Sequence, residues 1–298
     1  MMVEMRCKFG TLLSGAKPIM DRDILLSISQ SDLNSLLEKS RDDTIVSAFT
    51  DAYDRWIRSS ECNSITGFDR YDRYMVFAVT YAIEQFLMKY RHRRIRTFNG
   101  EYPGTTELLR GYDLTHSSLE EDSIRPSDAV IMSAPFSGSG NMHPLMQQVL
   151  DACDAMGVPV LIDCAFFGIC KDLHLNERSC IETMAFSLSK CYGLNTHRIG
   201  MIYSRSAPFA VELLHNAGYT SRFGAALAIE LFKKFSPDYI YSKYSKAQSI
   251  VCNELNLVPS NTVLFGNGDA TWNKFNRGGN HNRVSFSEFL PELVTPNV

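Results

Sequence analysis

The chain has 298 residues, of which 45% are hydrophobic and 21% are charged, so it is long and apolar enough to bury a large core. Its net charge of −3 argues against nucleic-acid binding, because nucleic-acid-binding proteins concentrate positive charge. No stretch reaches the roughly 18 apolar residues of a membrane span, and the N-terminus lacks the pattern of a signal peptide, so we expect a cytoplasmic protein that binds no membrane.

The eight cysteines indicate neither a disulfide framework nor a metal site. None of them forms a Cys-x-x-Cys pair, and none is spaced with histidines as zinc ligands are. We therefore expect buried free thiols in a reducing compartment and no bound metal.

The first third of the chain combines helices with short strands. Apolar residues at helical spacing in Asp32–Lys39 and Asp43–Tyr53 predict that residues 1–60 are helical. A buried strand is expected over Tyr74–Thr80 and a short helix over Ala82–Tyr90. The alternating stretch Arg94–Phe98 predicts another strand, which ends before the turn at Asn99-Gly100.

The middle of the chain alternates strands with helices. The expected elements are strands over Asp128–Ala134, Val158–Asp163, Ile181–Ser187 and Gly200–Ser204, and a helix over His143–Met156. This alternation predicts an α/β fold with three layers (α/β/α) around a mostly parallel sheet. Functional sites in such sheets lie beyond the carboxyl ends of the strands.

The rest of the chain is predicted to be mostly helical. The expected helices cover Ala207–Asn216, Arg222–Lys234 and Asp238–Asn256, and a strand-and-loop tail contains Arg283–Phe286. No linker separates these elements from the α/β region.

Three charged residues lie at or just beyond the ends of predicted strands. Asp163 ends one apolar run, Lys190 follows another, and Arg198 comes eight residues after the lysine. A lysine that forms an imine, a carboxylate that pairs with a ring nitrogen and an arginine that binds a phosphate are what pyridoxal 5'-phosphate (PLP) requires. The pattern therefore predicts a PLP site.

Around these residues, over about positions 80–204, the chain resembles the fold-type I PLP enzymes of the aspartate aminotransferase (class I/II aminotransferase) superfamily. Ser187-Leu-Ser-Lys190 resembles the family's Ser-x-x-Lys, in which the lysine holds the cofactor as a Schiff base and the serine contacts its phosphate. Arg198-Ile-Gly resembles the phosphate-binding Arg-x-Gly. Asp163-Cys-Ala-Phe resembles Asp-x-Ala-Tyr, whose aspartate keeps the pyridine ring protonated.

The resemblance nominates four further residues. Tyr102, in Gly100-Glu-Tyr-Pro-Gly, would stack on the cofactor ring, and Ser137 would donate to the ring oxygen. Thr80 lies where a strand-to-helix turn binds the phosphate. Arg283 matches the arginine that binds the substrate carboxylate.

The chain also departs from the family pattern. Phe166 stands where many members have a tyrosine that bonds to the ring oxygen, and Ala78-Val-Thr-Tyr81 lacks the usual Gly-Ser/Thr turn. The chain is short for the family, so a reduced C-terminal α+β domain is expected. The predicted division is an N-terminal helical segment (1–60), a PLP-binding large domain (61–235) and a small domain (236–298).

The resemblance implies a PLP-dependent aminotransferase that acts on a small amino acid as a homodimer. Two alternatives remain: a PLP-dependent lyase or cyclase that eliminates a β- or γ-substituent, and a non-catalytic PLP-fold module that binds a partner. The segment Asp69–Tyr74 is either a substrate or partner contact or a polar loop. His143 and His197 are either a second acid–base group or ordinary structural residues.

Overall fold

A seven-stranded sheet organises the larger part of the molecule. The structure is a computed structural model that describes residues 3–206 and 208–294. The strands of this sheet are β4 (Asp72–Val76), β5 (Arg94–Thr97), β6 (His116–Ser118), β7 (Asp128–Ser133), β8 (Val160–Cys164), β10 (Ile181–Ser187) and β11 (Gly200–Ser204). Their order is β4-β11-β10-β8-β7-β5-β6, and only β11 runs against its neighbours. The predicted mostly parallel α/β sheet is confirmed.

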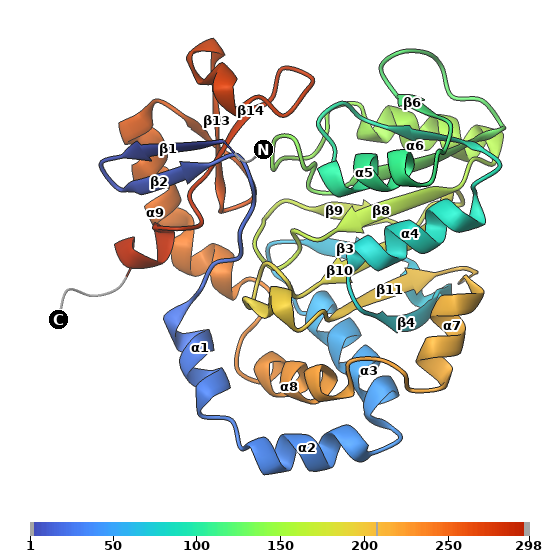
Figure 1. Ribbon diagram of the computed structural model, residues 1–298, viewed down its shortest axis with the longest axis vertical. Coiled ribbons are helices and arrows are strands. Elements are labelled where there is room, and N and C mark those ends of the chain that lie inside the picture. The colour runs from blue at the N-terminus through green and yellow to red at the C-terminus, as the bar shows by residue number, and fades with distance from the viewer. Residues whose placement is uncertain (1–2, 207, 295–298) are drawn as a thin grey trace.

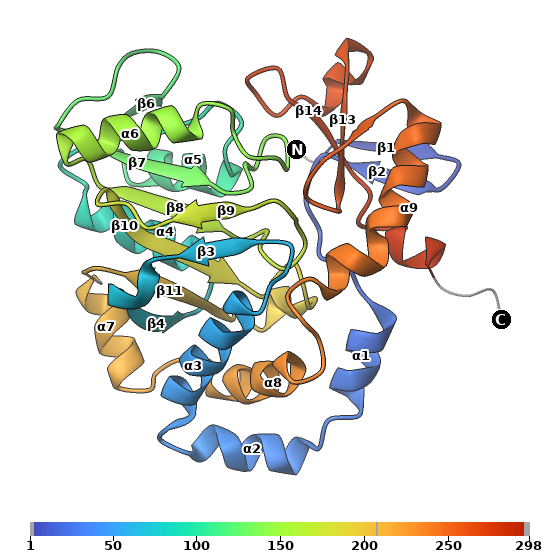
Figure 2. The ribbon, with the colours of Figure 1, turned by 180° about the vertical axis from the view of Figure 1, so that it is seen from behind.

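Helices cover both faces of this sheet (Figures 1 and 2). One face is covered by α4 (Val79–Lys89), α5 (Pro103–Gly111) and α7 (Phe209–Asn216), and the other by α3 (Ile45–Arg58), α6 (Met146–Met156) and α8 (Arg222–Phe232). Strand β7 contributes to both layers, because successive side chains of a strand point to opposite faces. Ala129 and Ile131 join the apolar cluster under α4, whereas Val130 and Met132 join the larger cluster on the opposite face.

A smaller antiparallel sheet lies beside the large one and joins the two ends of the chain. Its order is β1-β2-β14-β13-β12, and its strands are β1 (Glu4–Cys7), β2 (Gly10–Leu13), β12 (Val258–Pro259), β13 (Phe265–Gly268) and β14 (Asn282–Ser285). Helix α9 (Tyr239–Leu255) packs against it, and Figure 1 shows the blue hairpin β1–β2 beside the red strands β13 and β14.

The prediction that residues 1–60 are helical is wrong for the first stretch of the chain. Strands β1 and β2 form a hairpin that pairs with β14, while α1 (Arg22–Ser29), α2 (Leu33–Arg41) and α3 supply the expected helices. The N-terminal residues therefore complete the small sheet. The proposed division at residues 60 and 235 remains a prediction.

Several element boundaries also differ from those expected. The strand predicted over Tyr74–Thr80 ends at Val76, and α4 already begins at Val79. Helix α6 begins at Met146 rather than at His143. Residues 1–2, 207 and 295–298 of the predicted segments lie outside the described residues.

The remaining regular elements are short. A two-stranded parallel sheet joins β3 (Ser64–Thr66) to β9 (His174–Asn176), and 3-10 helices span Phe68–Arg70, Leu194–Thr196, Ala270–Phe275 and Leu290–Leu293. Within the described part of the chain, no helix is long and apolar enough to cross a membrane.

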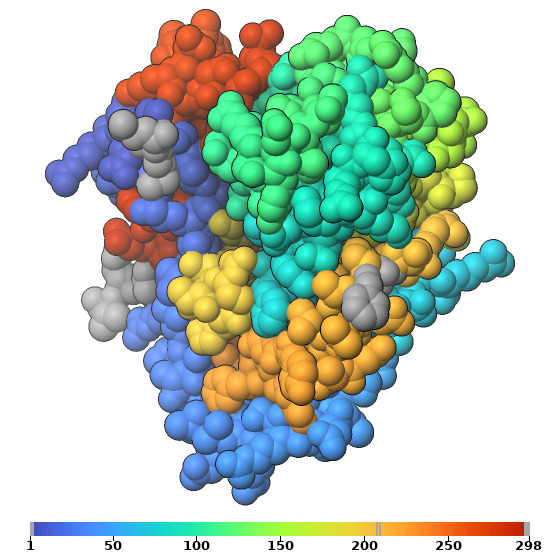
Figure 3. All heavy atoms as spheres, turned by 45° about the vertical axis from the view of Figure 1, so that its right-hand side comes forward, coloured from blue at the N-terminus to red at the C-terminus, as the bar shows by residue number. Residues whose placement is uncertain are grey.

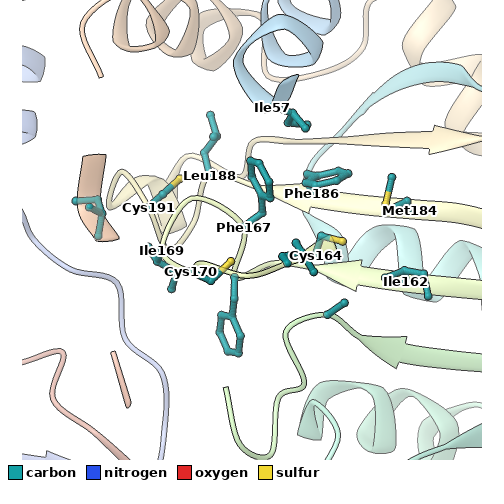
Figure 4. Packing of buried hydrophobic residues seen from close by; sticks show 14 of the residues in the cluster. Ile57, Ile162, Cys164, Phe167, Ile169, Cys170, Met184, Phe186, Leu188 and Cys191 are labelled. Atoms are coloured by element: carbon teal, nitrogen blue, oxygen red, sulfur yellow. The ribbon is translucent and has the colours of Figure 1, made fainter. Parts of the chain in front are cut away.

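An apolar cluster supports the strand ends that position the site (Figure 4). Phe167 and Phe186 meet edge to face with ring centroids 5.4 Å apart, and Cys164 and Leu188 are fully buried beside them. These four residues lie within four positions of Asp163 or Lys190 in the sequence. Their close packing therefore restrains the backbone that carries both charged side chains.

All eight cysteines are free thiols. Among residues 3–206 and 208–294, no group of His, Cys, Asp and Glu side chains is arranged to hold a metal ion.

Candidate active site

The carboxyl ends of β7, β8 and β10 lie next to one another and open into one cavity. Ser133 at the end of β7 is in register with Asp163 of β8, and Asp163 is in register with Ala185 of β10. Parallel strands expose their carboxyl ends at the same edge of a sheet, which is where ligands bind in α/β folds. The cavity there has a volume of about 420 Å³.

Every residue nominated from the sequence lines this cavity. The eight residues are Thr80, Tyr102, Ser137, Asp163, Ser187, Lys190, Arg198 and Arg283. They come from the large sheet, its connecting loops and the small sheet. In Figure 3 the blue and red ends of the chain pack beside the green and teal part of the large domain, with the yellow stretch that follows β10 near their junction.

Lys190 lies three residues beyond β10 with its amine inside the protein. Its Nζ donates a hydrogen bond to the main-chain carbonyl of Ala16, in the N-terminal segment. Burial lowers the pKa of Lys190 to about 8, and the nearby Arg283 and Arg198 act in the same direction, whereas Asp163 opposes them. Near neutral pH the neutral amine, which is the form that attacks a carbonyl carbon, is therefore more abundant than it is for an exposed lysine.

Asp163 is a buried carboxylate whose side chain has one hydrogen bond within the described part of the chain. Its side chain is 6% exposed, and Oδ1 accepts from the N–H of Ala165 at 2.8 Å. Burial raises the pKa of Asp163 to about 6, although the Ala165 hydrogen bond and Lys190 pull it down. No ion pair joins it to a cation in the described residues. A cationic ring nitrogen would hold this carboxylate in its ionised form.

Several hydrogen-bond donors also line the cavity. Helix α4 begins here with Ala78 as its N-cap, so no side chain caps its first N–H groups, and Thr80 lies in its first turn. Among the described residues, the Arg198 side chain (φ +51°) donates only to the carbonyl of Asn195, at 3.2 Å, and the Ser187 hydroxyl lies 2.7 Å from that of Ser189. A helix N-terminus, an arginine and two hydroxyls are the donor set that binds a phosphate, so these residues fit PLP.

Other parts of the cavity lining are formed by aromatic side chains and by side chains that carry a hydroxyl group. Tyr102 immediately precedes α5 and its side chain is 38% exposed, while Phe166 packs edge to face on Phe265 at 5.3 Å. Phe166, which stands where the family pattern has a tyrosine, has no hydroxyl, whereas Ser137 brings a hydroxyl to the same cavity lining.

Arg283 is buried on β14 of the small sheet and lines the cavity. It is 1% exposed, lies over the ring of Phe265 at 4.0 Å, and donates to the carbonyls of Ser14 (2.8 Å) and Ser137. A substrate carboxylate at this arginine would compete with those two carbonyl oxygens.

Two ionisable residues of the site were missed from the sequence. Glu101 is buried next to the cavity lining without being part of it. Its carboxylate accepts hydrogen bonds from the N–H of Ser133 at 2.7 Å and from the Ser133 hydroxyl at 2.6 Å. Arg277 lines the cavity six residues before Arg283. Glu101 precedes the nominated Tyr102, but nothing local in the sequence indicates its burial.

Other residues considered from the sequence lie elsewhere. In the Asp69–Tyr74 segment, Arg73 pairs with Asp51 at 2.8 Å on α3, and the segment does not line the cavity. His143 stacks on Phe98 with centroids 3.6 Å apart, and neither His143 nor His197 lines the cavity.

The fold and the chemistry of this cavity define a PLP-dependent enzyme of fold type I. Residues 61–249 match the model of the family described as aminotransferase class I and II, which covers more than half of the chain, and the protein belongs to that family. No curated protein sequence matches the chain.

Solved structures support the same fold. An aminotransferase from Mycobacterium tuberculosis is 13% identical, with a TM-score of 0.67 over 94% of this chain and 87% of that one. Histidinol-phosphate aminotransferase from Sinorhizobium meliloti, solved with PLP, is 18% identical, with a TM-score of 0.64 over 93% and 88%. A C-S lyase from Staphylococcus hominis is 9% identical, with a TM-score of 0.67 over 93% and 85%. At these identities the likeness concerns the fold alone.

Proposed function

We propose that this PLP-dependent enzyme is an aminotransferase that converts a small amino acid to its 2-oxo acid. The observation that carries the proposal is that Asp163, from the end of β8, and Lys190 and Arg198, from the connection between β10 and β11, line the same cavity. PLP, when bound, withdraws electrons from the α-carbon of an amino acid attached to it.

The lining side chains have two roles in this proposal: they bind the cofactor, and one of them transfers a proton. Lys190 would hold the cofactor through Nζ and, with its amine free, would move the proton at the substrate α-carbon. Asp163 keeps the ring nitrogen protonated. Arg198 and Ser187, with the first turn of α4, bind the phosphate.

The remaining nominated residues orient the ring and the substrate. Tyr102 stacks on the ring, Ser137 donates to its oxygen, and Thr80 contributes to the phosphate site. Arg283 binds the substrate carboxylate, which fixes the α-carbon near the Lys190 amine.

A product assay tests this function. The purified protein, loaded with PLP, is incubated with a panel of amino acids, first alone and then with 2-oxoglutarate. Transamination predicts 2-oxo acid and pyridoxamine phosphate in the first case and glutamate in the second. The absence of both products, with every amino acid tested, would contradict the proposal.

Elimination is the second candidate reaction. It is favoured by Phe166, which leaves the ring oxygen without the tyrosine hydroxyl of many relatives, and a C-S lyase shares the fold. A lyase would break the C–S bond of cysteine- or cystathionine-like substrates, would release sulfide or a thiol together with ammonia and a 2-oxo acid, and would regenerate PLP without a second substrate. The same assay therefore separates the two reactions.

We further propose that the protein is a cytoplasmic homodimer. Exposed apolar side chains on and near α1 and α2, including Leu25, Leu33 and Leu37, supply a surface that a second copy would cover. The eight free thiols suit a reducing compartment. Sedimentation should give about twice the 33.6 kDa chain mass, and a fully active monomer would contradict the dimer.

A further inference from the structure

The buried carboxylate of Glu101 has no ion-pair partner in the part of the chain that the structure describes. The residue is 8% exposed and lies between the end of β7 and the start of α5. A buried charge is costly unless an opposite charge or several hydrogen bonds compensate it. The hydrogen bonds of Glu101 therefore decide which form of the carboxyl group fits its surroundings.

Both oxygens of this carboxyl group accept a hydrogen bond from a backbone N–H. Oε1 accepts from the N–H of Ser133 at 2.7 Å, and Oε2 accepts from the N–H of Tyr102 at 3.1 Å and from the Ser133 hydroxyl at 2.6 Å. A backbone N–H can only donate, so a proton on either oxygen would weaken one of these contacts. The ionised form of Glu101 is the form that satisfies all three donors.

The Ser133 hydroxyl connects Glu101 to the cavity. Its hydrogen is donated to Glu101, which leaves its oxygen free to accept from the N–H of Ser137 at 2.7 Å. Ser133 itself lines the cavity, as do Ser137 and Tyr102. One carboxylate outside the lining therefore holds the backbone of the two residues that the proposed function places against the cofactor ring.

Asp163 links the charge of Glu101 to the cofactor. Burial raises the pKa of Glu101 to about 7, the charge of Asp163 adds to this effect, and the hydrogen bonds oppose it. A cationic ring nitrogen at Asp163 would offset the repulsion between the two carboxylates, so cofactor binding favours the ionised form of Glu101. The neighbouring cations are Lys190, which acts on Asp163, and Arg283, which donates to the carbonyl of Ser137.

We propose that Glu101 is a positioning residue: its negative charge, acting through Ser133, holds two loops in the arrangement that binds the cofactor ring. A proton on Glu101 removes the carboxylate acceptor of the Ser133 hydroxyl and loosens both loops. The inference rests on the proposed function, in which Tyr102 of one loop stacks on the ring and Ser137 of the other donates to its oxygen. It adds that a group which does not touch the cofactor makes the affinity for the cofactor depend on pH.

The pH dependence of non-covalent binding tests the proposal. Pyridoxine 5'-phosphate has no aldehyde and cannot bond to Lys190, and fluorescence titration of the cofactor-free protein gives its Kd. In Glu101→Gln, which resembles the protonated acid, this Kd should equal that of the wild type below about pH 6 and exceed it on the order of tenfold above about pH 8. The ratio of the two Kd values isolates Glu101, because the ligand, Asp163 and Lys190 titrate in both proteins.

Two further variants separate charge from packing. Glu101→Asp keeps the negative charge and should recover part of the affinity above about pH 8. Glu107→Gln removes a carboxylate of α5 whose side chain is 72% exposed, and it should match the wild type at every pH. A role of Glu101 in packing alone predicts a Kd ratio for Glu101→Gln that does not change with pH.

A double-mutant cycle tests the connection through Ser133. Ser133→Ala removes the hydroxyl between Glu101 and Ser137, so above about pH 8 it should weaken binding by a factor similar to that of Glu101→Gln. The double variant should then bind little more weakly than either single variant. Losses that multiply would mean that the two side chains act independently.

These measurements need no catalysis, so they separate the inference from the proposed function. A Kd ratio that rises with pH supports the role of Glu101 even if no amino acid is transaminated. A constant ratio, or multiplied losses in the double variant, would overturn the inference and leave the aminotransferase proposal standing. A wild-type protein that binds no pyridoxine 5'-phosphate at any pH would contradict both.

Discussion

The buried carboxylate of Glu101 accepts hydrogen bonds from both polar groups of Ser133, from its N–H at 2.7 Å and from its hydroxyl at 2.6 Å. It also accepts from the N–H of Tyr102 at 3.1 Å, and the Ser133 hydroxyl accepts from the N–H of Ser137 at 2.7 Å. One side chain therefore ties the loops of Tyr102 and Ser137 to the end of β7, beside Asp163. Such a network holds in position the two residues that we propose contact the cofactor, Tyr102 and Ser137.

Replacing Glu101 with glutamine should change how stability depends on pH. Burial raises the pKa of Glu101 to about 7 from an ordinary value of 4.5, although its hydrogen bonds oppose the shift. Between those values the folded state binds more protons than the unfolded state, so the free energy of unfolding falls as pH rises. In Glu101→Gln this fall, at most about 3 kcal/mol, should be absent.

Chemical unfolding of the cofactor-free protein from pH 4.5 to 7.5 measures this effect. Asp163, whose pKa is raised to about 6, contributes a similar trend in both proteins, so the difference between them isolates Glu101. Identical slopes for the wild type and the variant would show that Glu101 titrates as an ordinary carboxyl group.

Replacing Arg198 with glutamine should weaken the binding of PLP but not of pyridoxal, which lacks the phosphate. Arg198 has no acidic partner in the described residues, so it is available for the phosphate. A lost charge-assisted pair predicts a rise in the Kd of PLP on the order of 10- to 100-fold. Fluorescence titration with both ligands measures it, and equal weakening for PLP and pyridoxal would exclude a specific phosphate contact.

Replacing Gly104 with alanine should displace the Tyr102 ring without removing it. A Cβ on Gly104 would lie 2.4 Å from a ring carbon of Tyr102, so the ring must move. If Tyr102 stacks on the cofactor, PLP affinity should fall about tenfold, a loss comparable with that of an aromatic stacking contact. Gly111→Ala is a matched control in the same helix, because its Cβ would meet nothing within 4 Å. Unchanged PLP binding in Gly104→Ala would leave Tyr102 without a stacking role.

The rate at which the cofactor-free protein takes up PLP should rise with pH. The neutral lysine amine is the nucleophile, and burial lowers the pKa of Lys190 to about 8. Stopped-flow absorbance at a series of pH values should therefore give a midpoint near 8. A midpoint near 10.5, the ordinary value of a lysine, would mean that the amine is exposed to water during the reaction.

Much of the site was predictable because its residues stand in local patterns. Asp163 lies at the end of one apolar strand, and Lys190 and Arg198 lie in the connection between the next two. The alternation of strands and helices predicted the fold, and the motifs around these three residues carried the family resemblance that nominated the others. Glu101 and Arg277 were missed because their environment depends on distant segments. Glu101 is anchored by Ser133, 32 positions along the chain, and Arg277 by Ser14, 263 positions away.

The N-terminal hairpin was unpredictable for a related reason. Strands β1 and β2 have four residues each, too few for an alternating pattern to stand out, and the pairing with β14 joins Leu13 to Ser285 across most of the chain. The start of α4 was misplaced because Val79 and Thr80 favour strands by propensity, whereas the helix that packs over the sheet includes them.

The attachment point of the cofactor tests the central claim most directly. The PLP-loaded protein is reduced with borohydride, digested and analysed by mass spectrometry. We expect one pyridoxyl group per chain, on the peptide that contains Lys190, and none in Lys190→Ala treated in the same way. A pyridoxyl group on any other lysine of the wild-type protein, or no specific label at all, would contradict the proposed site.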